Sequence, residues 1–133
     1  MTPVIPAFRP ASWVVAALVL LLMVPPLQAD PVPSTQTGLA SYYHNRFHGR
    51  RTASGERHDQ NQFMAAHRRL PLGSRVRVTN LDNSRSIEVK INDRGPHGSR
   101  KRIIDLSQRA ARELGFLKKG LTQVKIEVLE LGD

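Results

Sequence analysis

The amino-acid sequence predicts an all-β protein in which short strands, with one or two small helices, close into a barrel. Three segments carry the prediction, because apolar and polar residues alternate in each of them: residues 75–80, 86–91 and 124–129. Alternation with a period of two is typical of a strand with one face in the core and one in water. The periodicity alone does not say which barrel forms.

The first strand is expected at residues 38–43, where the folded domain begins. The strands at residues 75–80 and 86–91 are separated by the polar segment 81–85, so we expect them to form a hairpin. The last strand, at residues 124–129, presents three valine and isoleucine side chains on one face and Lys and Glu on the other.

Two helices are expected, a short one at residues 61–67 and a better defined one at residues 107–114. Ser107 is a suitable N-cap for the second helix, and Gly115 is a suitable residue to end it. Its buried stripe would consist of Ala110, Ala111 and Leu114.

Residues 1–29 have the pattern of a secretory signal peptide. Arg9 is the only charged residue before Asp30, and residues 13–24 form an uninterrupted apolar run that ends at two prolines. This run is shorter than the roughly 20 residues needed to cross a bilayer, so we expect cleavage and no stable membrane anchor. The protein is then expected to be periplasmic or secreted.

Residues 30–37 are rich in Pro, Ser and Thr, which predicts a flexible leader. A single domain, expected to be monomeric, then covers residues 38–131. Without Arg9 the formal net charge falls from +9 to +8, which indicates an anionic partner. An exported chain rarely meets nucleic acid, so cell-wall polymers or acidic lipids are favoured. The absence of cysteine excludes disulfides, thiol catalysis and an N-terminal lipid on cysteine.

Residues 91–96 place an acid, Asp93, where an alternating strand gives way to a Gly-Pro break. A carboxylate at such a position can be presented to a substrate by a rigid scaffold. The structural alternative is that Asp93 only caps the turn at Arg94 and Gly95.

Seven segments, in order and without large gaps, resemble the domain of the rare lipoprotein A (RlpA) family. They are residues 38–43, 49–56, 65–67, 70–73, 76–80, 92–96 and 104–107. The resemblance implies a six-stranded double-psi β-barrel, the fold of expansins and barwin-like proteins. It also implies lytic transglycosylase activity, without a cofactor, on the MurNAc-β-1,4-GlcNAc bond of peptidoglycan strands. Strands without stem peptides would be preferred, and 1,6-anhydro-MurNAc ends would result.

The same resemblance assigns the catalytic acid to Asp93 and supporting active-site roles to Glu56 and His67. One carboxyl group can protonate the leaving oxygen and then accept a proton from the attacking 6-hydroxyl, whereas a hydrolase uses two carboxylates. The alternative for Glu56 is an ion pair with Arg57 or another surface base. The alternative for His67 is a helix cap or a packing residue.

Further residues are expected to bind the substrate. Tyr42 and Tyr43 could form a platform for sugar rings, or they could pack in the core. Arg68 belongs to one of three basic clusters that could hold anionic groups of the glycan, although a run of charge is usually a solvated face. Arg94, the residue after Asp93, is also expected to bind the substrate. Asp105 is expected to order the helix start. No metal site is expected, because the histidines lack the spacing of a zinc site.

Two family features are absent from this sequence, the lipobox cysteine and a C-terminal peptidoglycan-binding SPOR domain after the last strand. We therefore expect the domain to bind its polymer only through electrostatic attraction and the contacts of its binding groove. The alternative function is that of a non-catalytic, expansin-like module that binds or loosens the cell wall.

Overall fold

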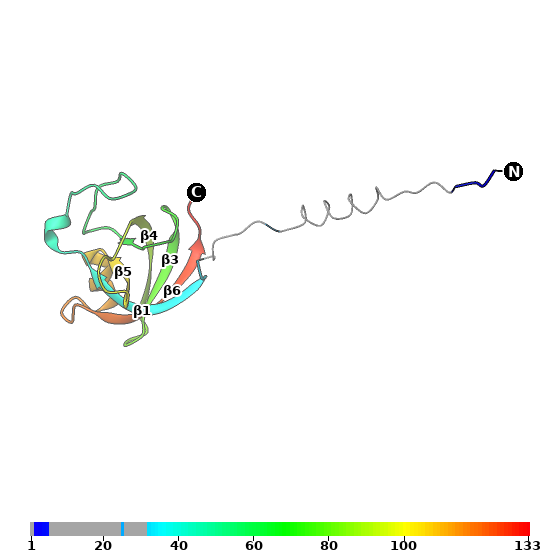
Figure 1. The fold of residues 1–133 in the computed structure, drawn as a ribbon. Coiled ribbons are helices and arrows are strands. Elements are labelled where there is room, and N and C mark those ends of the chain that lie inside the picture. Colours follow the sequence, from blue (N-terminus) through cyan, green and yellow to red (C-terminus); the bar gives the residue numbers. More distant parts are fainter. Residues whose placement is uncertain (1, 6–24, 26–31) are drawn as a thin grey trace. The chain divides into compact units, whose positions relative to one another are not determined.

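The computed structural model describes residues 2–5, 25 and 32–133. Residues 32–133 form one compact unit, whose six strands close into a barrel in the order β1-β5-β2-β4-β3-β6 (Figure 1). The predicted all-β, closed six-stranded barrel is therefore confirmed. The predicted signal peptide lies outside the described residues, except for residues 2–5 and 25, and stays a prediction.

The barrel strands are β1 Thr35–Tyr42, β2 Met64–Ala66, β3 Arg75–Asn80, β4 Ser86–Asp93, β5 Arg102–Leu106 and β6 Thr122–Glu130. A 3-10 helix, η1 Asn45–Phe47, follows β1, and the α-helix α2 Gln108–Leu114 follows β5. The β1–β5 and β2–β4 pairs are parallel, and the other four pairs are antiparallel. Apolar side chains that are at most 2% exposed fill the interior, among them Val76, Val78, Ile91, Ile104 and Ile126.

The strands expected from alternation are present. β3 and β4 form the predicted hairpin, with Val76 opposite Val89, and β6 contains the predicted C-terminal strand. β1 begins at Thr35, three residues before the expected strand. Residues 35–37, expected in the flexible leader, instead pair with β6, where Thr35 lies opposite Glu127.

The helix predicted at residues 61–67 is wrong, because Met64–Ala66 forms strand β2 between β4 and β5. All three β2 residues are buried, and a short apolar run without alternation fits a buried strand as well as a helical turn. β5 was missed for a related reason. Ile103 and Ile104 are adjacent and both buried, which breaks the alternation.

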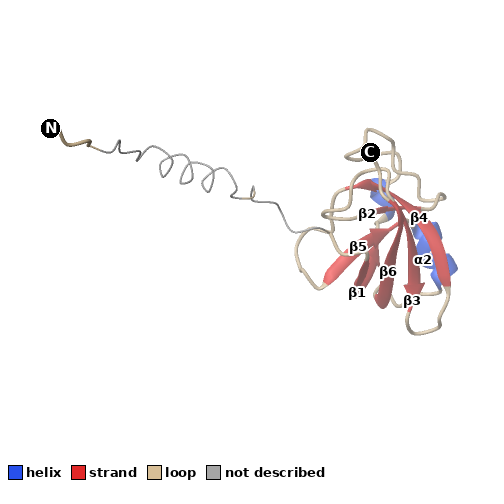
Figure 2. Ribbon diagram, turned by 90° about the vertical axis from the view of Figure 1, so that its right-hand side faces the viewer, coloured by secondary structure: helices blue, strands red, loops and turns tan. Residues whose placement is uncertain are grey.

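The second predicted helix is confirmed as α2, which packs against β4 and β1 on the outside of the barrel (Figure 2). Ser107 is its N-cap, and its hydroxyl accepts from the Ala110 N–H. Gly115 ends the helix with φ 81°, a left-handed conformation that glycine adopts without strain. Among the described residues, no helix is long and apolar enough to cross a membrane.

Substitution Ser107→Ala tests this cap. The Ser107 hydroxyl is buried and joins the segment before β2 to α2, since it donates to the Gln62 carbonyl at 2.5 Å and accepts from Ala110. We expect the free energy of unfolding, measured by urea denaturation, to fall by about 1–2 kcal/mol. The exposed Ser86, at the start of β4, provides the matched control Ser86→Ala. Equal losses in both variants would contradict the assigned role.

Candidate active site

A cleft of about 640 Å³ lies beside the barrel. Its walls come from the ends of β1 and β4, from β5 and from the long loop that follows η1. Strand register brings four residues of neighbouring strands into one row: Asp93 of β4 is opposite Ala66 of β2, Ala66 is opposite Asp105 of β5, and Asp105 is opposite Ser41 of β1. Two carboxylates, those of Asp93 and Asp105, therefore line one cleft.

Three donors from three parts of the chain hold the Asp93 carboxylate. The Tyr43 hydroxyl donates to Oδ2 at 2.5 Å. The backbone N–H groups of Ala53 and Arg94 both donate to Oδ1, at 2.8 and 2.9 Å. Asp93 thus caps the turn at Arg94, which was the structural alternative for this residue. The same side chain also lines the cleft.

The turn after Asp93 depends on Gly95. Its φ of 135° is a conformation that residues with a Cβ rarely adopt. A Cβ built there would lie 3.7 Å from the Cβ of Ala66, in ordinary van der Waals contact, so backbone conformation and not space requires glycine.

Asp105 does not order the start of α2, since Ser107 caps that helix. Its Oδ1 accepts from the Ser41 hydroxyl at 3.2 Å, and Arg102 donates to the same hydroxyl at 3.1 Å. Burial raises the pKa of Asp105, and this outweighs the opposing effects of the Ser41 hydrogen bond and the Arg102 charge.

The two tyrosines expected to bind sugar both line the cleft, but their rings also pack on other aromatic side chains. Tyr43 is 9% exposed, and its ring centroid lies 4.1 Å from that of His58. Burial raises the pKa of Tyr43, and the hydrogen bond to Asp93 adds to the shift, so Tyr43 remains a donor. Tyr42 contacts Phe116 edge-on and donates to the Leu117 carbonyl at 2.6 Å.

Glu56 does not line the cleft. Its carboxylate pairs with Lys90 of β4 at 2.8 Å, which is the surface ion pair left open as the alternative. The pair joins β4 to the loop that carries Ala53. The structure therefore connects Glu56 to Asp93 through this loop and not by direct contact.

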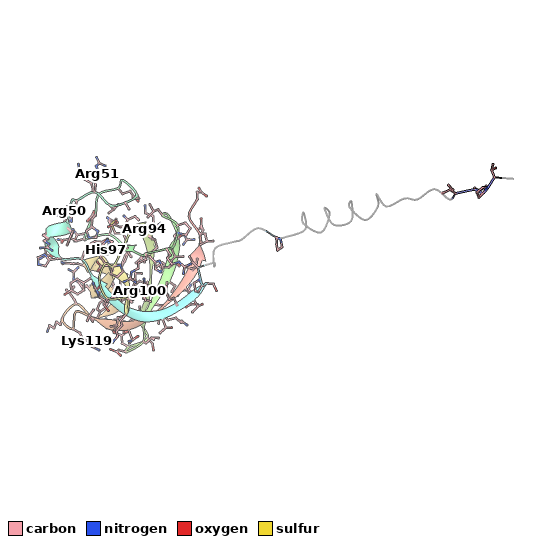
Figure 3. All side chains as sticks on the ribbon, viewed as in Figure 1. Arg50, Arg51, Arg94, His97, Arg100 and Lys119 are labelled. Carbon is pink, nitrogen blue, oxygen red and sulfur yellow. The ribbon has the colours of Figure 1, made fainter. Side chains whose placement is uncertain are left out.

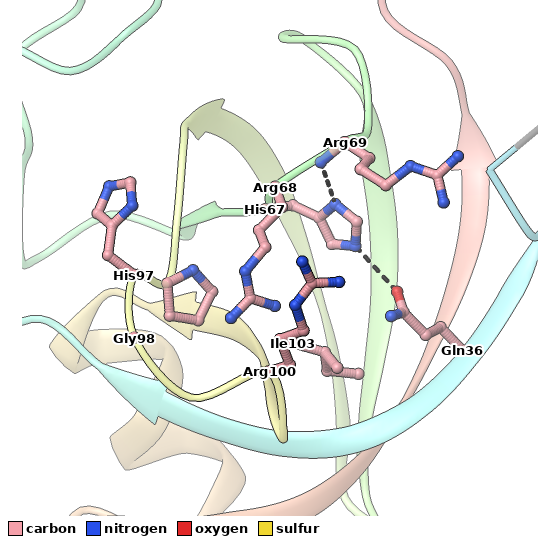
Figure 4. A pocket seen from close by; sticks show the side chains of 9 residues that line it. Gln36, His67, Arg68, Arg69, His97, Gly98, Arg100 and Ile103 are labelled. Carbon is pink, nitrogen blue, oxygen red and sulfur yellow. Dashed lines mark hydrogen bonds between the residues drawn. The ribbon is translucent and has the colours of Figure 1, made fainter. Parts of the chain in front are cut away.

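His67 lines a second pocket of about 580 Å³ that adjoins the cleft, since Pro96 and His97 line both (Figure 4). Its Nδ1 accepts from the N–H groups of Arg69 and Leu70, each at 3.1 Å. Nε2 therefore carries the proton of the neutral ring and donates to Gln36 Oε1 at 2.9 Å. Burial, assisted by the charges of Arg94, Arg68 and Arg69, lowers the pKa of His67 to about 4.

The two arginines expected to bind substrate lie at different pockets. Arg94 lines the cleft, and its guanidinium donates to the carbonyls of His67 and Leu70. Arg68 lines the second pocket and donates to the Ser99 carbonyl at 2.9 Å. Figure 3 shows further basic side chains, with Arg50 and Arg51 on the long loop and Lys119 at the opposite end of the barrel. In the part of the chain that the structure describes, no group of three or more His, Asp or Glu residues is placed to hold a metal ion.

Sequence reasoning missed two residues of the site. Asp105 interrupts the apolar run of Ile103, Ile104 and Leu106, and a charged residue inside such a run was the available signal. Gln36, the partner of the His67 ring, was assigned to the leader, because strand β1 was expected to begin at residue 38.

Comparison with known proteins gives a consistent family. A family described as lytic transglycolase matches residues 35–126. The endolytic peptidoglycan transglycosylase RlpA of Neisseria meningitidis serogroup A is 57% identical over 99 residues, which are 74% of this chain and 41% of the relative. The RlpA protein of Haemophilus influenzae is 55% identical over 94 residues, 71% of this chain and 32% of the relative. The chain thus spans less than half the length of these curated relatives.

Solved structures support the fold. Streptomyces papain inhibitor is similar with a TM-score of 0.60 and 26% identity, over 75% of this chain and 98% of the inhibitor. Clavibacter michiganensis expansin, solved as a variant in complex with cellohexaose, is similar with a TM-score of 0.58 and 16% identity. That match covers 72% of this chain and 50% of the expansin.

The His67 ring provides a pH test of the second pocket. Its pKa is about 4 in the folded protein and about 6.5 in an unfolded chain, so the unfolded state binds more protons between these values. The free energy of unfolding should therefore decrease as the pH falls from about 6.5 to 4, by at most about 3 kcal/mol from this group. An NMR titration of the ring should give a midpoint near pH 4.

Substitution His67→Asn is the control, because its amide oxygen can still accept from the backbone while the titrating group is lost. Its free energy of unfolding should depend less on pH over that range. A ring that titrates near pH 6.5 in the folded protein would contradict the assigned burial and hydrogen bonding.

Proposed function

The chain belongs to the RlpA family, and from this premise we propose that it is an endolytic peptidoglycan lytic transglycosylase. It would cleave the MurNAc-β-1,4-GlcNAc bond and leave 1,6-anhydro-MurNAc ends, with stem-peptide-free strands as the preferred substrate. Its site of action would be outside the cytoplasm, in the periplasm or beyond the cell, where peptidoglycan lies. The observation that carries the proposal is the oriented Asp93 carboxylate in an open cleft.

The hydrogen bonds of Asp93 select the reacting oxygen. A carboxylate oxygen offers two lone pairs. Both lone pairs of Oδ1 are used by the Ala53 and Arg94 N–H groups. Among the described residues Oδ2 accepts from Tyr43 alone, which leaves its second lone pair for a proton that can be transferred to substrate.

The reaction then needs only this one oxygen. Protonated Oδ2 donates its proton to the glycosidic oxygen, and the bond from C1 to that oxygen breaks as positive charge develops on the muramyl ring. The 6-hydroxyl of the same ring attacks C1, and Oδ2 accepts its proton. The carboxyl group returns to its starting state, and no water is consumed.

The other site residues are proposed to position Asp93 or the substrate. Glu56, through Lys90, would hold the loop whose Ala53 N–H donates to Asp93. The His67 backbone N–H donates to the Asp93 carbonyl at 3.1 Å, which connects the turn after β2 to the acid.

Substrate contacts follow from the lining of the cleft. Tyr42, Tyr43 and Arg94 line it and would contact the sugar rings. Asp105, the second carboxylate in the row, lies two strands from Asp93, about 10 Å between backbones at the usual strand spacing. Its negative charge could stabilise the positive charge that develops on the muramyl ring.

Substitution Asp93→Asn tests the proposal directly. Incubation of the purified protein with stem-peptide-free glycan should release fragments with anhydro-muramyl ends, identified by mass spectrometry. Asp93→Asn should lower the rate at least about a hundredfold, because the amide cannot donate a proton as a carboxylic acid does. Asp82→Asn is the matched control, since Asp82 pairs with Lys119 outside the cleft.

Other product patterns would contradict the proposal in different ways. Reducing ends that have gained water would indicate hydrolysis by the Asp93 and Asp105 pair. Binding to insoluble cell wall without new ends in any protein would indicate the expansin-like module. Equal rates for Asp93→Asn and Asp82→Asn would show that Asp93 is not the catalytic acid.

A further inference from the structure

Arginine side chains from two segments line the second pocket. Arg68 enters it from the turn after β2, and Arg100 enters from the segment between β4 and β5. Figure 4 shows both guanidinium groups directed into the pocket, whereas the Arg69 guanidinium turns away from them. No acidic residue is among the described residues that line the pocket.

Two like charges directed into one pocket repel each other unless an anion lies between them. Arg68 uses one nitrogen on the Ser99 carbonyl. Within the described part of the chain, no hydrogen bond or ion pair joins the Arg100 guanidinium to another residue. A planar guanidinium presents a fork of donors that matches a carboxylate, so the pair has donors to spare for such a group.

The neighbouring His67 does not compete with a carboxylate for the arginines. His67 is held neutral by burial and by the surrounding arginines, and its Nε2 proton is committed to Gln36. The ring therefore adds no negative charge and no free acceptor that would compete for the guanidinium donors. The positive charge of the pocket therefore comes from its arginines and not from His67.

The pocket is also continuous with the cleft. Pro96 and His97, which follow the Asp93 turn, line both cavities. A polymer that lies across Asp93 and continues past this segment reaches Arg68 and Arg100. In a peptidoglycan strand every second sugar carries a lactyl ether, whose carboxylate is free when no peptide is attached and is an uncharged amide when one is.

We propose that the Arg68–Arg100 pocket is a subsite that binds the free lactyl carboxylate of a muramyl residue next to the cleaved bond. This proposal rests on the proposed function, and it gives a physical reason for a preference for strands without stem peptides. Attachment of a peptide removes the charge that the two guanidinium groups bind. The acceptor is then a neutral amide carbonyl, which forms weaker hydrogen bonds.

The test compares three glycans of the same length: free lactyl carboxylates, carboxylates converted to methylamides, and intact stem peptides. Binding is measured in the Asp93→Asn protein, so that no strand is cleaved. We expect tightest binding for the free carboxylate. Arg68→Gln combined with Arg100→Gln should weaken this binding about tenfold or more, while binding of the methylamide glycan should change less than about twofold.

Arg112→Gln is the control for a general loss of charge, because Arg112 is exposed on α2 and lines neither cavity. It should leave all three affinities nearly unchanged. In protein that retains Asp93, the two pocket substitutions should raise KM for free-carboxylate glycan and leave kcat largely unchanged.

Three outcomes would overturn the subsite. The pocket substitutions could leave binding of free-carboxylate glycan unchanged, or they could weaken binding of the free and methylamide glycans equally, which would indicate only long-range attraction. Arginine-dependent binding that is strongest for intact stem peptides would assign the pocket to peptide carboxylates instead. The protein that retains Asp93 could also distinguish the glycans in binding and yet cleave none of them. That result would support the subsite and refute only the proposed activity.

Discussion

The chemistry available to this molecule depends on how the Asp93 carboxylate is held. Its three donors come from the end of β1, from the loop after η1 and from the turn that follows Asp93 itself. Each donor belongs to a different segment, and the closed barrel brings these segments to the same place. Because two backbone N–H groups occupy Oδ1, Oδ2 is the oxygen that we propose to react. A general acid positioned in this way can act without a mobile partner.

The cleft and the pocket that adjoins it differ in their lining residues: the cleft contains two carboxylates beside five arginines, namely Arg46, Arg50, Arg51, Arg94 and Arg102. The row from Asp93 through Ala66 to Asp105 places two carboxylates in the cleft, with a residue as small as alanine between them. The adjoining pocket contains arginines and no lining acid among the described residues. In the proposed reaction, negative charge near the bond to be cleaved would stabilise a developing cation, and positive charge farther along the strand would bind its carboxylates. Arg68 and Arg100, two of the basic residues of the chain, therefore lie where an anionic polymer would continue past the cleft.

The sequence predicted those parts of the structure that depend on local pattern. Alternation identified β3, β4 and β6, and the cap residues Ser107 and Gly115 identified α2. Alternation did not predict β2 and β5, because residues buried on both faces of a strand remove the alternating pattern. The sequence also predicted that Asp93 would be presented at a strand end, but not that Asp105 would share the cleft or that Gln36 would bind His67. Those contacts join residues far apart in sequence, and only the strand order of the barrel brings them together.

The most direct measurement is a crystal structure of the Asp93→Asn protein with a stem-peptide-free glycan bound. We expect one glycosidic oxygen to lie within about 2.6–3.2 Å of the residue 93 side-chain atom that replaces Oδ2. We also expect the strand to pass over Pro96 and His97 and to place a lactyl carboxylate between Arg68 and Arg100. A glycan bound elsewhere on the barrel, or one that crosses the cleft with no glycosidic oxygen near residue 93, would contradict the proposed function.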